Sequence, residues 1–563
     1  MNQRRVITLF TLVLLGFVSV SIRLIDLMVL EHERYAERAY RQHVKQETIA
    51  PRRGAIYDAR MRELAVNRKV KSLYGVPGEI KDPESVAKAI SSIVGVSRRD
   101  LAGKLSREKQ FVWLARKLED GVAARIEKLG LRPRIGFVPE TKRSYPKGAL
   151  AAHVIGFANI DNEGAEGLER TYDSILRGHG DSKLDGRDAH GRPLSDGDEH
   201  NVNGGSLVLT LDEDLQFIVE KELADAVRKW KARAAVSIVM EPATGRILAM
   251  AVNPTYSPES PQKPARWRNR AITDVYEPGS TFKSMVAVAA LDQSVVRPKD
   301  RFDCSQGYIE VGGRRIRDSR RHETLTFAEV LQKSSNVGIV KVAQLVGNER
   351  LFTYISRFGF GEKTGVDLDG EVAGILHSPD EWSGSSIGAH AVGYEVAVTP
   401  LQMLNAYCAI ANGGILMRPH IVSEIMNAEG KVVRSIAPRP IRRVMSRATS
   451  ETLTRILETV VQEGGTAITA SVLGNPVAGK TGTARKYDPE TRRYSREKYM
   501  SSFVGFVPSD NPRLAIIVVV DEPEEEIYGG TVAAPVFRAI AEHSLVYLNI
   551  PRRDGGNVLF VTK

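Results

Sequence analysis

A serine and a lysine three residues apart could together transfer an acyl group through the serine oxygen. On a helix this spacing places both side chains on one face, where a neutral lysine can accept the serine proton. Lysine is neutral near pH 7 only where burial or a neighbouring cation lowers its pKa. The spacing alone is a weak signal, because six such pairs occur, beginning at Ser85, Ser106, Ser144, Ser260, Ser280 and Ser495.

Ser280 and Lys283 differ from the other five pairs in their surroundings. Ser280 follows Pro278-Gly279 and precedes TFKSMVAVAALDQ, whose strongly apolar face predicts a buried helix. The start of a helix directs backbone N–H groups and the positive end of its dipole at a serine oxygen. A serine that merely caps the helix is an equally good local explanation.

A Ser-x-Asn motif would supply the small polar groups that such a site needs for proton transfer. Ser334 and Asn336 lie in FAEVLQKSSNVGIVKVA, between two apolar helical segments, where small polar residues often face a cleft. The competing match, Ser509 to Asn511, lies in a predicted turn between strands, where Asp and Asn are expected anyway.

A Lys-Thr-Gly motif on a strand would hold a peptide substrate. Lys480, Thr481, Gly482 and Thr483 lie in NPVAGKTGTARKY, shortly before two strand-like runs, whereas the match at 363–365 lies in a glycine-rich stretch with no strand pattern. Glycine lets another backbone approach the strand edge, where an extended peptide can be added and its carboxylate bound.

The order of the motifs favours one set among these candidates. Ser280 with Lys283, Ser334 with Asn336, and Lys480 with Gly482 follow one another along the chain, each in the better of its contexts. Together they form the S-x-x-K, S-x-N and K-T-G set of penicillin-recognising serine enzymes. Chance readily explains one of these motifs but not three in order.

The elements around these motifs predict an α+β fold. AAVSIVM and RILAMAV are strand-like runs around EPATG, and SSFVGFVPS and RLAIIVVVDEP form a second such pair near the C-terminus. The segments between the two pairs have mostly helical patterns. We therefore expect one antiparallel sheet, flanked by helices, in which the two ends of this region meet.

The N-terminus predicts a membrane anchor. Residues 6–22 carry no charge and apolar character extends to residue 30, which is long enough to span a bilayer. A cleaved signal peptide is less favoured, because the apolar stretch is longer than the usual ~7–15 residues and no A-x-A site follows. Arg4 and Arg5 place the N-terminus in the cytoplasm.

Three further segments predict local structure between the anchor and the motifs. Residues 31–46 predict a charged helical stalk, and residues 186–205 predict a loop. Residues 212–230 predict a helix that links two regions.

Length and composition are those of an ordinary globular protein. The 563 residues suffice for two to four domains, and 42% hydrophobic with 26% charged residues excludes a disordered chain or a disulfide scaffold. The net charge of +11 is a mild bias towards an anionic partner, and no nucleic-acid-binding signature accompanies it. Cys304 and Cys408 could form a disulfide, although two buried free thiols are favoured. No metal-ligand spacing occurs.

With these motifs the chain resembles class B penicillin-binding proteins, over essentially its whole length. The stretches 51–58 and 143–178 resemble the family's pedestal segments, although 59–61 (Ala-Arg-Met) departs from the usual Arg-Asn-Gly. VTPLQML, GKTGTARK and IYGGTVAAPVF resemble the septal, cell-division type. The resemblance implies a cytoplasmic tail (1–5), a transmembrane signal anchor (6–30), an elongated pedestal domain (31–225), a transpeptidase domain (226–550) and a C-terminal tail (551–563).

The resemblance also implies a role for each motif residue, in a peptidoglycan D,D-transpeptidase that needs no cofactor. Ser280 is acylated by the penultimate D-Ala of a stem peptide as the terminal D-Ala leaves, and Lys283 is its general base. Ser334 relays a proton to the leaving amine, and Asn336 holds Lys283 and the substrate amide. Lys480 supplies positive charge, Thr481 and Thr483 bind the substrate carboxylate on either side of Gly482, and the N–H groups of Ser280 and Thr483 form the oxyanion hole. A β-lactam, with a similar carboxylate and a strained amide, would acylate Ser280.

The expected partners are peptidoglycan stem peptides, β-lactams, a membrane glycan polymerase and other division proteins, at the septal inner membrane and without nucleic acid. Three alternatives remain. A D,D-carboxypeptidase or β-lactamase would use water as acceptor but needs no pedestal. A β-lactam sensor would need a cytoplasmic domain, and a scaffold would not need Ser280 and Lys283. The charged segment 485–502 is interpreted as a solvated hairpin rather than a loop that contacts glycan or a partner.

Overall fold

The computed structural model describes residues 3–26, 44–48, 51–131, 134–178, 182–186, 203–261, 263–488 and 490–553. They fall into two compact units, Met1–Arg52 with Gly178–Gly204 and Arg53–Arg177 with Gly205–Lys563. Most of the expected stalk, loop and C-terminal tail lies outside the described residues. The expectation of a helical stalk over residues 31–46 is wrong at its C-terminal end, because residues 44–46 belong to a strand.

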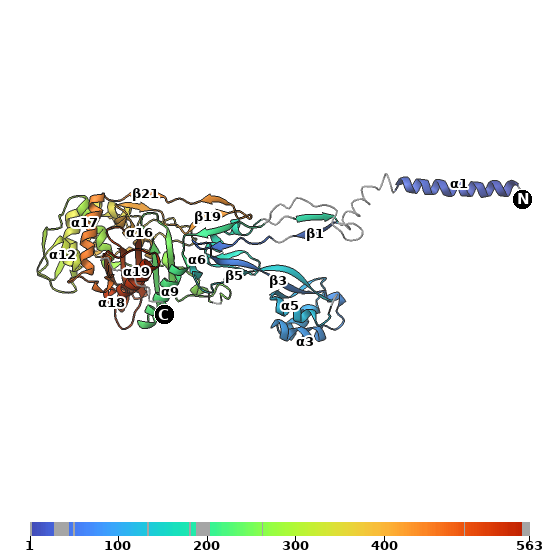
Figure 1. Ribbon diagram of the computed structural model, residues 1–563, viewed down its shortest axis with the longest axis horizontal. Coiled ribbons are helices and arrows are strands. Elements are labelled where there is room, and N and C mark those ends of the chain that lie inside the picture. Colours follow the sequence, from blue (N-terminus) through green and yellow to red (C-terminus); the bar gives the residue numbers. More distant parts are fainter. Residues whose placement is uncertain are drawn as a thin grey trace. The chain divides into compact units, whose positions relative to one another are not determined.

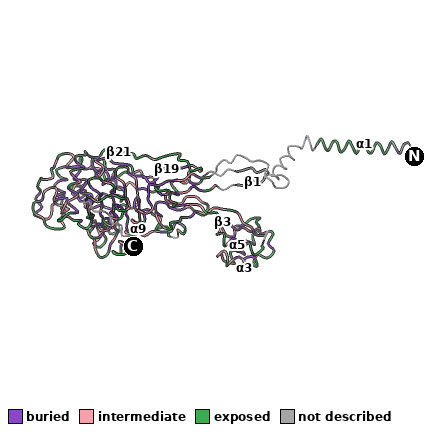
Figure 2. The backbone as a smooth tube through the Cα atoms, viewed as in Figure 1, coloured by how far each residue is buried: buried purple, intermediate pink, exposed green. Residues whose placement is uncertain are grey.

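The first unit contains helix α1 (Gln3–Ile25) and one pair of short strands. Within α1, Ile7–Ile25 has a mean hydropathy of 2.1, which makes it long and apolar enough to cross a membrane. The residues of this stretch are exposed, as the colour of the backbone in Figure 2 shows. Strand β1 (Val44–Thr48) pairs antiparallel with β8 (Ser182–Gly186).

A five-stranded antiparallel sheet forms the core of the C-terminal region, which we define as residues 213–550. Its order is β11-β10-β24-β23-β22, with bounds β10 Ala234–Met240, β11 Ile247–Asn253, β22 Ala478–Asp488, β23 Arg493–Val507 and β24 Leu514–Asp521. Strands β10 and β24 are buried throughout and pair from Ala234 with Asp521 to Met240 with Ala515. The prediction of one sheet in which the ends of the region meet is therefore confirmed. Strand β22, which carries the Lys-Thr-Gly motif, lies at an edge.

Helices surround this sheet in the larger body of Figure 1. Helices α9 (Glu213–Lys229) and α19 (Ala534–Tyr547) pack against each other and against the sheet, and α16 (Pro400–Ala411) contacts β10, β23 and β24. Helix α11 (Lys283–Asp292) is buried on nearly all sides between α13 (Asn336–Val346), α14 (Asn348–Arg357) and α17 (Arg447–Glu458). The predicted helix 212–230 corresponds to α9, and the expected domain boundary at 225/226 falls inside it.

The pedestal region, which we define as residues 53–177, contains a small lobe and four strands (β2, β3, β4 and β5) of a seven-stranded sheet. The sheet order is β20-β19-β9-β2-β3-β4 with β5 on β3. Its bounds are β2 Ile56–Tyr57, β3 Glu63–Gly75, β4 Val112–Leu118, β5 Ile135–Ser144, β9 Ser206–Leu209, β19 Val422–Met426 and β20 Val432–Ser435. Helices α3 (Pro83–Val94), α4 (Arg98–Leu105) and α5 (Asp120–Glu127) enclose a separate small core. Two strands of the pedestal sheet thus come from the C-terminal region.

A buried ion cluster joins the pedestal segments that the sequence singled out. Glu169 accepts a hydrogen bond from Arg53 Nε at 2.5 Å and another from Arg143 Nε at 2.6 Å. All three side chains are at most 2% exposed. Since a buried charge is costly unless it is paired, the two stretches 51–58 and 143–178 must fold together.

Shorter elements complete the described chain. They are α6 Ala152–Ile155, β6 Phe157–Ala158, β7 Gly164–Glu166, α7 Gly167–Thr171, α8 Asp173–Leu176, α10 Arg270–Thr273, β12 Arg301–Asp303, β13 Tyr308–Val311, β14 Arg314–Arg317, β15 Thr324–Thr326, α12 Phe327–Gln332, β16 Ile375–Leu376, α15 Ser386–Ala391, β17 Val396–Ala397, β18 Ile415–Met417, β21 Pro440–Arg443 and α18 Gly529–Val532.

Candidate active site

Ser280 lies in a tight turn that leads into α11. The turn is the 3₁₀ segment Gly279–Phe282, so Ser280 precedes the α-helix proper, which begins at Lys283. Gly279 has a φ of +56°, a conformation that glycine adopts without strain. Ser280 is partly exposed, and among the described residues its Oγ has no hydrogen-bond partner. A substrate can therefore reach this oxygen.

Buried hydrogen bonds hold the turn in place. Thr281 Oγ1 donates to Pro278 O at 2.8 Å, and Tyr407 Oη from α16 donates to Thr281 O at 2.9 Å. The Gly279 N–H donates to Gly393 O at 3.0 Å. These contacts fix the position of Ser280 from both sides along the chain.

Lys283 is fully buried and points at the Ser-x-Asn motif. Its Nζ donates to Asn336 Oδ1 and to Ser334 O, both at 2.6 Å, and lies 3.2 Å from Ser334 Oγ. Burial lowers the pKa of Lys283 to about 7, against the opposing attraction of Asp318. A large fraction of Lys283 is therefore neutral near pH 7 and can act as a base.

Lys480 brings a second buried ammonium group to the same place. It projects from β22, is fully buried, and its Nζ donates to Ser334 Oγ at 2.9 Å. Burial and then repulsion from Lys283 hold the pKa of Lys480 well below its usual value. The hydroxyl of Ser334 thus lies between two lysines, which is a suitable position for a proton relay.

Asp318, which belongs to none of the sequence motifs, holds the Ser-x-Asn turn. Ser334 has a φ of +57°, which is unfavourable for a non-glycine residue. The carboxylate of Asp318 accepts from Ser335 Oγ at 2.8 Å, from Val337 N at 3.0 Å and from the Asn336 N–H. It therefore caps the N-terminus of α13 and compensates for the strained turn. Its only sequence signal is a single acid in an arginine-rich segment.

The edge strand β22 approaches the serine turn closely at Gly482. A Cβ at Gly482 would lie 2.4 Å from Ser502 Oγ and 2.9 Å from Pro278 O, so only glycine fits. Thr481 Oγ1 lies 3.0 Å from Thr466 Oγ1, and Thr483 Oγ1 accepts from Gly529 N at 3.0 Å. The free edge of this strand lies beside Ser280 and can pair with an extended peptide.

Glu277 is a second residue beside the site that belongs to none of the sequence motifs. Its Oε1 accepts from Tyr494 Oη and from the Glu395 N–H, both at 2.9 Å, and burial raises the pKa of the Glu277 carboxyl. Tyr494 belongs to the segment 485–502, in which β22 and β23 pair as far as Asp488 and Arg493. Glu277 thus fastens this hairpin to the chain three residues before Ser280.

The competing motifs lie elsewhere. Ser509 Oγ donates to Glu458, and Thr364 donates to Glu371, without a contact to Lys283, Lys480 or Ser334 within the described chain. Among the described residues, none of the other five Ser-x-x-Lys pairs forms a hydrogen bond with Lys283 or Lys480, so the pair Ser280 and Lys283 is the one beside this group.

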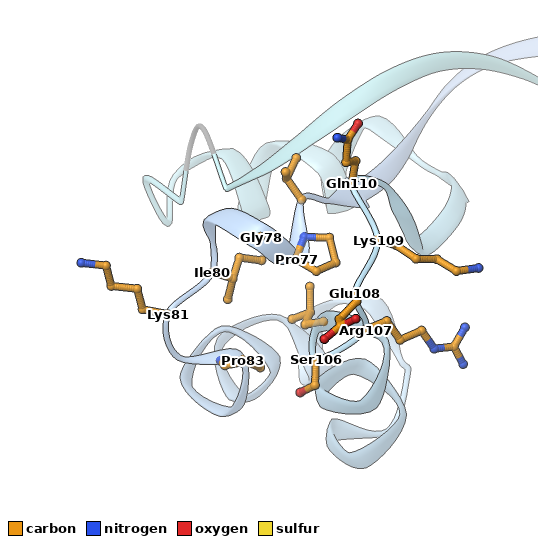
Figure 3. A pocket seen from close by; sticks show the side chains of 12 residues that line it. Pro77, Gly78, Ile80, Lys81, Pro83, Ser106, Arg107, Glu108, Lys109 and Gln110 are labelled. Atoms are coloured by element: carbon orange, nitrogen blue, oxygen red, sulfur yellow. The ribbon is translucent and has the colours of Figure 1, made fainter.

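Neither a metal site nor a disulfide is found in the described part of the chain. No three His, Cys, Asp or Glu side chains there are grouped so that they could hold a metal ion. Cys304 and Cys408 are both buried and free. An open cavity of about 610 Å³ lies in the small lobe of the pedestal region, beside Pro77, Ile80 and Leu105 (Figure 3). It contains none of the predicted site residues.

Comparison with known proteins identifies the family. The model of the penicillin-binding protein transpeptidase domain matches residues 235–542, and that of the penicillin-binding protein dimerisation domain matches residues 48–209. The chain belongs to the penicillin-binding protein transpeptidase family. A curated relative, peptidoglycan D,D-transpeptidase FtsI of Escherichia coli, is 34% identical over 535 residues, which cover 93% of this chain and 88% of the relative. Stage V sporulation protein D of Bacillus subtilis is 36% identical over 518 residues, 90% of this chain and 80% of the relative.

Solved structures of this penicillin-binding protein family share the fold. Penicillin-binding protein 3 of Mycobacterium tuberculosis, in complex with aztreonam, has a TM-score of 0.70 and 28% identity, covering 90% of this chain and 98% of that one. A peptidoglycan synthetase of Bifidobacterium adolescentis has a TM-score of 0.72 and 25% identity over 90% of this chain and 97% of that one. The predicted combination of a pedestal with an α+β transpeptidase domain is confirmed. With its apolar helix α1, this penicillin-binding protein is a single-pass membrane protein whose catalytic domain is extracellular.

Proposed function

We propose that this penicillin-binding protein is a serine-type peptidoglycan D,D-transpeptidase that cross-links stem peptides during septal cell-wall synthesis. One observation carries the proposal: Lys283 and Lys480, both fully buried, meet at Ser334 Oγ behind an accessible Ser280. Such a site can activate a serine and return a proton to a leaving amine.

Acylation uses Ser280, Lys283 and Ser334. Neutral Lys283 accepts the Ser280 proton while Ser280 Oγ attacks the carbonyl carbon of the penultimate D-Ala. The backbone N–H groups of Ser280 and Thr483 stabilise the resulting oxyanion. The peptide C–N bond then breaks, and a proton passes through Ser334 Oγ to the amine of the departing terminal D-Ala. Asn336, bonded to Lys283 at 2.6 Å, keeps the base in place and binds the substrate amide.

Transfer reverses this sequence with a second stem peptide. Its amine loses a proton to the same relay, attacks the ester carbonyl and forms the new amide, and Ser280 regains its proton. The donor peptide lies along β22, where Thr481 and Thr483 on either side of Gly482 bind its carboxylate and Lys480 supplies positive charge. A β-lactam presents a carboxylate and a strained amide to the same groups and acylates Ser280.

The division of the chain remains part of this proposal: a cytoplasmic tail (1–5), an anchor (6–30), a pedestal domain (31–225), a transpeptidase domain (226–550) and a C-terminal tail (551–563). We further propose that the protein acts at the division septum with a membrane glycan polymerase and other division proteins. The name FtsI of the Escherichia coli relative, and the similarity over 93% of this chain, support the septal assignment.

A fluorescent penicillin tests the proposal on the full chain in detergent, with Ser280→Ala as control. We expect a stable covalent adduct, visible by intact mass and absent from the control. Rapid release of hydrolysed drug would instead indicate a β-lactamase or D,D-carboxypeptidase. A folded protein without adduct would contradict the catalytic assignment and favour a scaffold.

A further inference from the structure

An arginine-rich segment borders the candidate active site. Between residues 314 and 321, the last strand of the β13–β14 hairpin and the loop after it carry five arginines and one acid. Arg314 pairs with Glu395 at 3.2 Å, and Arg315 pairs with Glu310 at 2.6 Å. The remaining three, Arg317, Arg320 and Arg321, are exposed, and their guanidinium groups have no ion-pair partner within the described chain.

The backbone of this segment is bonded to the catalytic side chains. Asn336 Nδ2 donates to Arg317 O at 2.7 Å, and Asn336 Oδ1 accepts from Lys283 at 2.6 Å. Arg317 is therefore two hydrogen bonds away from the general base. On its other side, the hairpin is tied through Arg314 to Glu395, whose N–H donates to Glu277 beside the serine turn.

The positive charge of the segment is not balanced locally. Its only acid, Asp318, accepts hydrogen bonds from Ser335 and from the N-terminus of α13. The Asp318 carboxylate therefore stabilises the turn and does not form an ion pair with the arginines. Exposed guanidinium groups bind carboxylates in a bidentate manner and attract them over about 10 Å at moderate salt. The segment therefore offers a carboxylate-binding rim on the Ser-x-Asn side of the site.

We propose that Arg317, Arg320 and Arg321 bind the free carboxylates of the acceptor stem peptide. This inference rests on the proposed transpeptidase function. The donor carboxylate is already assigned to β22, on the Lys-Thr-Gly side. The acceptor amine must deliver its proton to Ser334 and Lys283, and the segment that carries the arginines is bonded to Asn336 on that Ser-x-Asn side through Arg317 O. A carboxylate-bearing acceptor bound there would bring its amine towards the acyl-enzyme.

The test measures transfer from a thioester donor to two acceptors, with the full chain in detergent. One acceptor is a stem tetrapeptide with free carboxylates, and the other is the same peptide with those carboxylates amidated. The test variant is R320Q/R321Q. Arg317 is left unchanged because its backbone carbonyl is bonded to Asn336, whereas within the described chain the backbone of Arg320 and Arg321 forms no hydrogen bond with the site residues. The matched control, R434Q/R439Q, removes two exposed arginines elsewhere. Penicillin acylation is measured in parallel, and anisotropy of the labelled tetrapeptide on penicillin-acylated protein reports binding without transfer.

We expect R320Q/R321Q to raise the KM for the free-carboxylate acceptor about fivefold and to weaken its binding to a similar extent. The amidated acceptor, penicillin acylation and the control variant should be unchanged. Equal KM and binding in variant and unmodified protein would overturn the inference, and so would an equal loss for both acceptors. Reduced binding of phosphatidylglycerol vesicles with an unchanged acceptor KM would also overturn it, in favour of a membrane contact. Absence of a penicillin adduct in the unmodified chain would instead refute the proposed function.

Discussion

At the residue scale, two buried lysines meet at one serine hydroxyl. Lys283 and Lys480 both donate to Ser334 Oγ, at 3.2 and 2.9 Å. Desolvation disfavours the charged form of each, and two ammonium groups at one oxygen repel each other. A neutral base is thus available near pH 7 without a metal or a histidine in the proposed mechanism.

The pH dependence of acylation follows from the Lys283 pKa of about 7. In the proposed mechanism neutral Lys283 accepts the Ser280 proton, and the neutral fraction of Lys283 grows as the pH rises. We therefore expect the acylation rate with a fluorescent penicillin to rise from pH 5.5, with a midpoint near 7, and to level off above pH 8. At pH 6 it should be about tenfold below the plateau. A flat profile, or a midpoint above 9, would contradict Lys283 as the base.

Asp318 should affect both the level and the pH midpoint of acylation. Its negative charge raises the Lys283 pKa, so Asp318→Asn should move the midpoint to lower pH. The amide can accept fewer of the three hydrogen bonds, which should reduce the plateau rate about tenfold. Glu323→Gln, which removes an exposed acid five residues further along the chain, is the control and should change neither quantity. A lower plateau with an unmoved midpoint would show that Asp318 acts on the turn alone.

At the scale of elements, the site depends on how closely strand β22 approaches the serine turn. A Cβ added at Gly279 would lie 3.2 Å from Ala484 Cβ, and a Cβ added at Gly482 would lie 2.9 Å from Pro278 O. The two elements contact each other through these glycines. Any side chain there must move the strand away from Ser280.

Gly482→Ala tests this contact. Because the added methyl group overlaps Ser502 and Pro278, we expect a loss of about 1–3 kcal/mol in stability and a larger proportional loss of acylation. The control is Gly103→Ala in α4, where a Cβ has nothing within 4 Å and where alanine should stabilise the helix by up to about 1 kcal/mol. Thermal unfolding and penicillin acylation measure both effects. Unchanged acylation in Gly482→Ala would show that strand and turn are not tightly coupled.

At the scale of the whole molecule, the sequence predicted what depends on local patterns. The strands at 234–240 and 514–521 are apolar runs, except for Ser237 and the final Asp521, and Ser280, Ser334 and Lys480 stand in short motifs of fixed spacing. Apart from the meeting of the sheet ends and the grouping of the three motifs, it did not predict contacts between residues far apart in the chain. Glu277 meets Tyr494 across 217 positions, and β19 joins β9 in the pedestal sheet. Such contacts arise from tertiary packing, which no local pattern encodes.

The packing of α9 makes the folding unit larger than the segment that matches the transpeptidase family. Leu215, Val219 and Leu223 of α9 are at most 1% exposed, and the helix packs on the sheet and on α19. Exposing three such side chains costs about 2 kcal/mol each, comparable to a total stability of about 5–15 kcal/mol. Residues 235–542 lack α9 entirely and end within α19.

We therefore compare chains truncated to residues 203–553 and 235–542. The longer chain keeps α9, all of α19 and strand β9, which pairs with β19, so it should remain soluble and bind penicillin at the rate of the full chain. The shorter chain exposes the sheet face that α9 and α19 cover, and we expect it to aggregate or to unfold at a much lower temperature. Thermal unfolding and adduct formation are measured on both. A stable, penicillin-binding 235–542 chain would show that α9 belongs to the pedestal side of the molecule, as the expected boundary at residue 225 implies.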